Sequence, residues 1–136
     1  MRTMLLDKRF LFGVLNGTIT VYFTKVMWCE KHKHRNIVKL NEHNIRLLES
    51  PNANCKYGVV EMLSARPSKV KDVTDEEIMK GGYKNRDDFV TWCKEKYNLL
   101  SENDEIGVVN IELHVIKEKG KEIFKELGLV IPKVRW

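Results

Sequence analysis

The chain has 136 residues, a length that fits one domain with a substantial hydrophobic core. Its composition, 43% hydrophobic and 32% charged, is ordinary for a soluble globular protein. The longest early apolar run, residues 10–15, is too short to cross a bilayer, and no signal-peptide cleavage region accompanies it. We therefore expect a cytoplasmic protein with no membrane partner, and the odd count of 3 cysteines argues against a disulfide framework.

Positive charge is concentrated in the first half of the chain. Residues 1–72 hold 13 Lys and Arg against 6 Asp and Glu, whereas residues 73–136 hold 11 against 13. This asymmetry indicates that an anionic partner contacts the first half. A lysine-rich solvated surface without such a partner gives the same charge balance, so both interpretations stay open here.

The first predicted elements are a helix and a strand joined by a glycine turn. Apolar residues recur at helical spacing over residues 8–16, and Asn16 and Gly17 supply the stop. Over residues 18–24 the period changes to two, which predicts a strand with Ile19, Val21 and Phe23 on its buried face. The opposite face carries hydroxyl groups, from Thr18, Thr20, Tyr22 and Thr24.

The region that follows is less regular. Residues 29–57 give no clear pattern beyond a basic loop, and two extended runs come next, at residues 57–65 and 68–73. In the second run Lys69 and Lys71 are expected to point the same way. They would either track a nucleic-acid backbone or protect a solvated sheet edge.

The middle of the chain is helical, with clear caps. Thr74 and Glu77 have the capping-box spacing, before a short helix that ends at Gly81 and Gly82. Asn85 is placed to cap a second helix. One face of that helix is expected to meet the core, through Phe89, Trp92, Cys93, Lys96 and Tyr97.

A strand over residues 106–116 and a helix over residues 119–127 complete the pattern, with Ile123, Phe124 and Leu127 expected to be buried. Strands and helices do not alternate regularly, which predicts an α+β fold: a small, curved, mostly antiparallel sheet or barrel with peripheral helices. No repeat or linker divides the chain. We therefore predict one domain over residues 1–136, with the helix and tail at 118–136 as an extension.

Three segments carry a resemblance to a known family: the early helix running into LNGTITVYF, then KVKDVTDEEIMKGGYKNRDDFVTWCKEKY, and finally NDEIGVVNIEL. They are similar to the glycine turn and Thr-rich strand, the strand and helical pair, and the closing strand of the ASCH family, a branch of the PUA-like superfamily. The resemblance covers about half of the chain. It implies a PUA-like β-barrel with a cleft between the early helix, the first strand and the helical pair.

The resemblance also implies that this cleft holds nucleic acid or a nucleobase. Some bacterial members deacetylate acetylated cytidine with a Lys, a Thr and a Glu. Here the lysine position falls on Ile19 or, in a second register that matches the threonine to Thr20, on Gly17, and the glutamate position falls on Gly81. Ile and Gly cannot perform acid–base or nucleophilic chemistry, so we predict that this amidohydrolase activity is absent and assign no catalytic residue.

The glycine turn, the hydroxyl face and the nearby basic residues form the predicted nucleic-acid-binding surface. Hydroxyl and cationic side chains contact phosphates, and an aromatic ring can stack on a base. A solvent-facing strand of high β-propensity is the alternative interpretation of the hydroxyl face. The predicted binding residues are Gly17, Thr18, Thr20, Tyr22, Lys25, Lys33, Arg35, Arg66, Lys69 and Lys71.

Cys29, His32, His34 and His43 superficially offer zinc ligands, but their spacing matches no structural zinc pattern, so we predict no metal and no cofactor. The leading prediction is that a basic cleft binds RNA, or a nucleotide or modified base, without catalysis. One alternative is an enzyme acting on a nucleic acid or nucleoside, such as a ribonuclease or divergent amidohydrolase. The other is a protein–protein adaptor that contacts its partner through the apolar tail, residues 130–136.

Overall fold

The structure is a computed structural model that describes residues 2–6, 8–31, 36–42, 57–99 and 101–133. Its helices are α1 (Lys8–Leu15), α2 (Val26–Lys31), α3 (Asp75–Lys80), α4 (Arg86–Tyr97) and α5 (Glu118–Glu126). Its strands are β1 (Arg2–Leu6), β2 (Val21–Thr24), β3 (Asn36–Glu42), β4 (Gly58–Lys69) and β5 (Glu105–Ile116). The predicted α+β class is confirmed.

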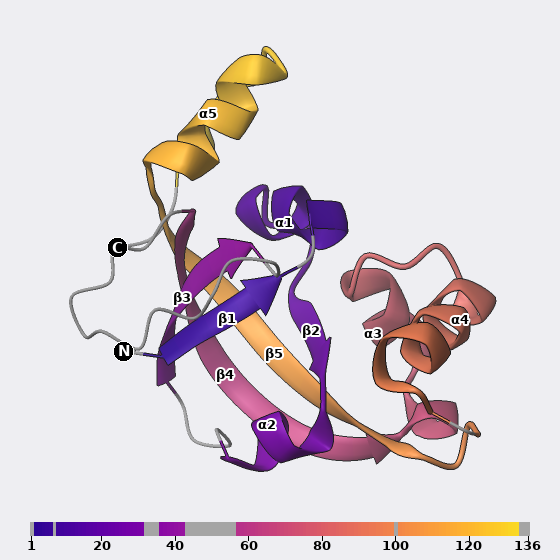
Figure 1. Cartoon of the computed structure of the whole chain (residues 1–136). Coiled ribbons are helices and arrows are strands. Elements are labelled where there is room, and N and C mark those ends of the chain that lie inside the picture. Colours follow the sequence, from indigo (N-terminus) through magenta and orange to yellow (C-terminus); the bar gives the residue numbers. More distant parts are fainter. Residues whose placement is uncertain (1, 7, 32–35, 43–56, 100, 134–136) are drawn as a thin grey trace.

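The strands form one mixed sheet in the order β1-β3-β4-β5-β2 (Figure 1). Only β1 and β3 are parallel, and the other neighbouring pairs are antiparallel, so the prediction of a mostly antiparallel sheet is confirmed. Among the described strands, β1 and β2 are the two edges and do not pair with each other. Within that part of the chain the sheet is therefore open, not closed into a barrel.

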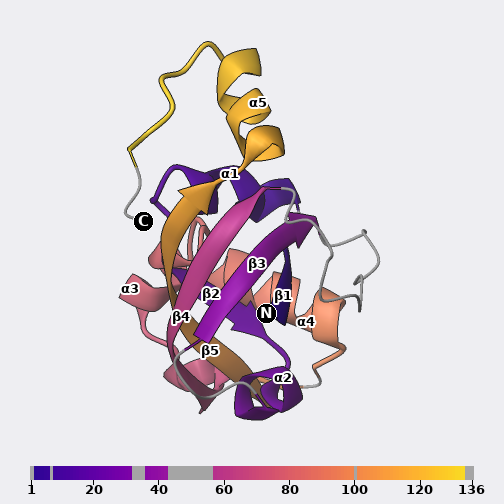
Figure 2. The ribbon, with the colours of Figure 1, turned by 90° about the vertical axis from the view of Figure 1, so that its left-hand side faces the viewer.

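The long strands β4 and β5 give the sheet its curvature (Figure 2). Their pairing shifts register twice. Val59 is opposite Val115 while Val60 is opposite Leu113, which leaves His114 as an extra residue on β5. A second shift leaves Leu63 as an extra residue on β4. An extra residue bends and twists its strand, and here two such bulges let a short sheet wrap around its core.

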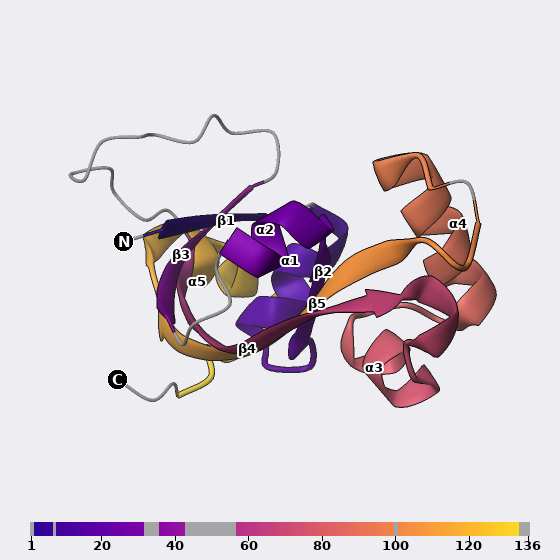
Figure 3. The ribbon, with the colours of Figure 1, turned by 90° about the horizontal axis from the view of Figure 1, so that it is seen from below.

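The helices divide between the two ends of the sheet. Helices α3 and α4 lie together beyond β2, at one end, and α5 extends from the other end after β5 (Figures 1 and 3). Aromatic rings join α4 to β2, with the Phe23 and Phe89 ring centroids 4.6 Å apart and Tyr83 within 5.8 Å of Phe23. This cluster fixes the strand that follows the glycine turn against the helical pair.

The predicted caps of the helical pair are confirmed. Thr74 and Glu77 form the capping box of α3, and the side chain of Asn85 accepts a hydrogen bond from the Asp88 amide at the start of α4. The helix predicted at residues 119–127 is α5, but Leu127 lies just beyond it and is 56% exposed, so its predicted burial is wrong. The helix ends one residue earlier, at Glu126, while Phe124, which was also expected to be buried, is 2% exposed.

Several boundaries differ from the sequence prediction. The sequence did not predict β1, α2 or β3, which are short segments without a distinctive apolar period. The run predicted at residues 57–65 lies in one strand, β4, which continues through Pro67, paired in register with Gly107, and ends at Lys69. The run predicted at residues 68–73 is therefore only partly confirmed, since residues 70–72 form a 3-10 helix. Within the described ranges, no helix is both long enough and apolar enough to span a membrane.

Candidate functional site

The turn after α1 is built by local hydrogen bonds. Gly17 has φ +81°, a left-handed conformation that favours glycine. The Asn16 side-chain oxygen accepts from the Thr18 amide at 3.0 Å and from the Thr18 hydroxyl at 2.7 Å. The Ile19 amide donates to the carbonyl of Gly13 at 2.9 Å. These bonds hold the backbone at Gly17 exposed at the surface.

Thr20 connects this turn to two other parts of the molecule. Its amide donates to the Lys80 carbonyl at the end of α3, and its carbonyl accepts from the Ile111 amide of β5, each at 2.9 Å. The regular ladder of β2 begins only at Val21, so the strand predicted over residues 18–24 starts three residues later than expected. The backbone of Thr20 thus links the helical pair to the centre of the sheet.

A cleft of about 250 Å³ opens beside this turn. Its floor is apolar and includes Val14, Leu15 and Ile19. Its polar wall is formed by Asn16, Gly17, Thr20, Glu112 and Lys133. The cleft exists because β2 pairs with β5 only as far as Asn110, so the rest of β5 has no strand on that side among the described residues.

In the first register, the positions at which the resemblance would require a lysine and a glutamate, Ile19 and Gly81, are closed by packing. In the second register the lysine position is Gly17, which is exposed and where an added Cβ would meet no atom within 4 Å. Ile19 is only 8% exposed, and a Cβ added to Gly82 would lie 2.6 Å from its Cδ1 atom. A Cβ added to Gly81 would lie 2.5 Å from Cε2 of Phe23. A glutamate at position 81 would therefore have to displace a core ring, so the carboxylate of the acid–base pair has no room here in either register.

The remaining predicted residues do not gather at this cleft. Thr24 pairs with Gly107, and Lys69 pairs with Glu105, so Lys25 and Lys69 lie near the start of β5, far along the sheet from Thr20. Lys71 follows Lys69 in a short 3-10 turn, residues 70–72, and all three lysines are exposed. The prediction that Lys69 and Lys71 share one strand face is wrong, because the strand ends at Lys69.

The hydroxyl face is only partly present. Thr18 is exposed and Thr20 is half-buried, but Thr24 is only 5% exposed. Tyr22 is half-buried beside α2, where its ring meets Trp28 edge-on at 5.8 Å. The expected outward position of Thr24 is therefore wrong, because α2, which the sequence did not predict, packs at this end of β4 and β5.

Arg66 holds β4 to α3. Its guanidinium donates to both carboxylate oxygens of Glu77, at 2.8 and 3.0 Å, while Glu77 also accepts from the Thr74 amide. Burial alone would raise the pKa of Glu77, but the bonds from Thr74 and Arg66 outweigh it and lower that pKa below its usual value of 4.5. Arg66 therefore has a structural partner, with which any phosphate would have to compete.

The basic loop and most of the superficial zinc ligands lie outside the described residues: His32, Lys33, His34, Arg35 and His43. Cys29 is described and is fully buried. Burial is also the main reason that the pKa of its thiol is raised, which disfavours the thiolate that a metal would need.

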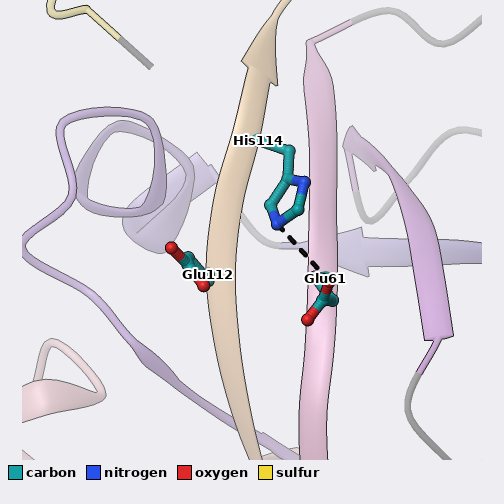
Figure 4. A group of neighbouring side chains, drawn as sticks. All are labelled: Glu61, Glu112 and His114. Atoms are coloured by element: carbon teal, nitrogen blue, oxygen red, sulfur yellow. Dashed lines mark ion pairs between the residues drawn. The ribbon is translucent and has the colours of Figure 1, made fainter. Parts of the chain in front are cut away.

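The structure brings together one polar group that the sequence analysis missed. Glu61 on β4 lies directly opposite Glu112 on β5, and Nε2 of His114 lies 3.6 Å from the Glu61 carboxylate (Figure 4). In the sequence, the alternation over residues 106–116 places Glu112 and His114 on one face of the predicted strand. Glu61 is a single charged residue in another, mostly apolar, predicted strand. The sequence pattern did not reveal that these strands, β4 and β5, are paired, and this pairing is what brings the three side chains together.

Comparison with known proteins identifies the fold but no family. The chain is similar to the crystal structure of protein EF3133 from Enterococcus faecalis V583, assigned to family model DUF984, with a TM-score of 0.65 and 9% sequence identity. The similarity covers 90% of this chain and 81% of that chain. No protein-family model matches the sequence, and no curated protein matches it significantly. At this identity the likeness establishes a small α+β fold alone.

Proposed function

We propose that the chain is an ASCH-type, PUA-like domain that binds single-stranded RNA, or a nucleotide or modified base, without catalysis. The cleft beside Gly17 is the observation that carries the proposal. The order of elements supports the family assignment: an early helix, a glycine turn, a threonine-bearing strand, a capped helical pair and a long strand. That family assignment is part of the proposal, although the described strands form an open sheet and not the barrel that the resemblance implied.

The chemistry of the cleft suits a base with its sugar or phosphate. Leu113 and Pro132, which are both partly exposed, offer an apolar surface for the face of a base, while Thr20 and Asn16 offer polar groups for its edge. Gly17 allows a ligand to approach the backbone, since it has no side chain, and Lys133 supplies a positive charge. The volume is slightly below the range of about 300–1,000 Å³ usual for ligand pockets, which favours a single base over a larger ligand.

The separation of the cleft from the exposed lysines favours a strand of RNA over a free nucleotide. Five residues of extended chain separate Thr20 from Lys25, or roughly 16 Å at about 3.3 Å per residue. A mononucleotide in the cleft would not reach Lys25 or Lys69. An RNA strand could place one base in the cleft and its phosphates along the sheet, with the predicted Lys33 and Arg35 as further contacts.

Packing at Ile19, Gly81 and Phe23 supports a binding function over the amidohydrolase chemistry of the family. The family's carboxylate would have to occupy a glycine position where an added Cβ meets a core ring, and its lysine would have to replace the buried Ile19 or, in the second register, the exposed Gly17. If the chain is nevertheless an enzyme on nucleic acid or nucleosides, Thr20→Ala will abolish turnover without unfolding the protein.

The direct test is fluorescence anisotropy with a labelled single-stranded RNA at several salt concentrations. Neutralising about three to five phosphates gives a slope of log affinity against log salt of roughly −2 to −3.5. Thr20→Val and Lys133→Ala should each weaken binding, while Thr91→Val and Lys119→Ala, at exposed positions on α4 and α5, serve as matched controls. Affinity that does not depend on salt, or no affinity for RNA, would contradict the proposal.

A second candidate function, a protein–protein adaptor, has one observation in its favour. The segment after α5 exposes apolar side chains, with Leu129 50% and Val130 91% exposed. Deleting residues 129–136 separates the two functions only in part, because Lys133 belongs to the cleft. Leu129→Ser with Val130→Ser is sharper: an adaptor would lose its partner while RNA affinity stays unchanged.

A further inference from the structure

We propose that Glu61, Glu112 and His114 bind a divalent transition-metal ion across the β4–β5 pair. We call these three residues the acid–histidine group. This proposal does not depend on RNA binding, and it concerns residues different from the Cys29 stretch that the sequence analysis considered for zinc. It rests on the geometry, burial and donor chemistry of the three side chains.

The geometry is close to that of a metal site. Each of the three residues offers one ligand atom, and these atoms all lie within 4.8 Å of one another. A tetrahedral ion with bonds of about 2.0–2.1 Å would hold its ligand atoms roughly 3.3 Å apart. The Glu61 and His114 atoms are already 3.6 Å apart, and the widest separation in the group is at most 4.8 Å. Side-chain rotations that shorten that separation by about 1.5 Å would complete the arrangement.

The backbone positions the three side chains with little freedom. Glu61 and Glu112 are directly opposite each other on adjacent antiparallel strands. The register shift next to them makes His114 the extra residue of a bulge, and such bulges commonly re-aim a side chain. Ligands on paired strands at the centre of a sheet are held more firmly than ligands on loops.

Burial and charge also favour a cation at this place. The side chains of Glu61 and His114 are only 10% and 16% exposed. Like charges directly opposite each other on paired strands are destabilising, and a low-dielectric setting strengthens that repulsion. A divalent ion between the two carboxylates would convert the repulsion into attraction, in addition to whatever other contacts these residues make.

The donor set indicates the class of ion. One imidazole nitrogen and two carboxylate oxygens suit first-row transition ions such as Zn²⁺, Mn²⁺ or Co²⁺, whereas Mg²⁺ and Ca²⁺ prefer oxygen donors alone. Three protein ligands leave at least one coordination position open. Glu112 also lines the cleft, so an ion bound here would lie at its wall.

The test uses Co²⁺ and Zn²⁺ with the full-length chain after treatment with a chelator. We expect one ion per chain by calorimetry, visible d–d absorption on adding Co²⁺, and displacement of Co²⁺ by Zn²⁺. Losing an outer partner of a metal ligand typically costs 10–100-fold in affinity, so Glu61→Gln and His114→Ala should each cost at least about 100-fold. Glu118→Gln is the matched control, because this exposed carboxylate lies in α5.

Three results would contradict the site. The first is no binding of either ion by the folded protein. The second is binding that His114→Ala and Glu61→Gln leave unchanged in variants whose circular dichroism shows a native fold. The third is a near-ultraviolet sulfur-to-cobalt charge-transfer band, which would place the ion at a cysteine instead. If a variant fails to fold, Glu112→Gln replaces it, since Glu112 is more exposed than Glu61.

Discussion

The cleft beside the Gly17 turn and the acid–histidine group share one residue, Glu112. The turn and the group nevertheless depend on the sequence in different ways. The turn is held by bonds between near neighbours, such as Thr18 to Asn16 and Ile19 to Gly13. The acid–histidine group depends on the pairing of two strands that are far apart in the chain. Local chemistry can be predicted from sequence, whereas strand pairing cannot.

The strongest way to test this contrast is to remove a contact that only the fold creates. Phe89 is fully buried between Phe23 and Tyr83. Phe89→Ala should lower the free energy of unfolding by about 3–5 kcal/mol, because it leaves a cavity in the aromatic cluster. Urea denaturation followed by tryptophan fluorescence measures this change. The exposed Leu129→Ala is the control and should stay within about 0.5 kcal/mol of the wild type.

A smaller loss of unfolding free energy is expected from adding a methyl group at Gly81 than from removing the Phe89 ring. Gly81→Ala places a Cβ 2.5 Å from the Phe23 ring, which must shift. Overpacking of this kind costs about 1–3 kcal/mol. The same substitution at the exposed Gly128 meets no neighbouring atom but has φ +68°, so its cost comes from backbone strain alone. Equal stability of Gly81→Ala and wild type would show that the family's glutamate position is not closed by packing.

The local capping box should contribute least. Thr74→Ala removes the N-cap of α3 and should cost about 1 kcal/mol in unfolding free energy. Thermal denaturation of this variant beside Thr91→Ala, an exposed helical position in α4, checks the value. A loss as large as that of Phe89→Ala would contradict the view that local caps are minor contributors to stability.

Glu77 gives the same region a pH dependence of known sign. Its pKa is lower in the folded protein than its usual value of 4.5, so the ionised form stabilises the fold. That contribution is fully present above the pKa of the unfolded chain and is lost as pH falls through the lower pKa of the folded state. In Glu77→Gln, the free energy of unfolding should therefore depend less on pH below about 4.5 than it does in the wild type. An unchanged pH dependence would show that Glu77 does not contribute to it.

The sequence predicted the α+β class, the helical pair with its caps, the glycine turn and the long strand β5. Those features depend on periodicity and on bonds between residues close in the chain. The sequence missed α2, and so placed Thr24 outside, and it gave Lys69 and Lys71 one face although the strand ends between them. It also could not predict that Glu61 would face Glu112, because one bulge changes which residues meet.

Hydrogen–deuterium exchange with and without a single-stranded RNA oligonucleotide tests the central proposal most directly, since it reports where RNA lies. Binding in the cleft predicts slower amide exchange in peptides covering residues 13–20 and 111–113, with no change in α4. The same slowing should be smaller in Thr20→Val at an RNA concentration that half-saturates the wild type, because loss of one hydroxyl contact weakens binding. Slowing confined to α4 or α5, or exchange unaffected by RNA at low salt, would contradict a nucleic-acid site at the glycine turn.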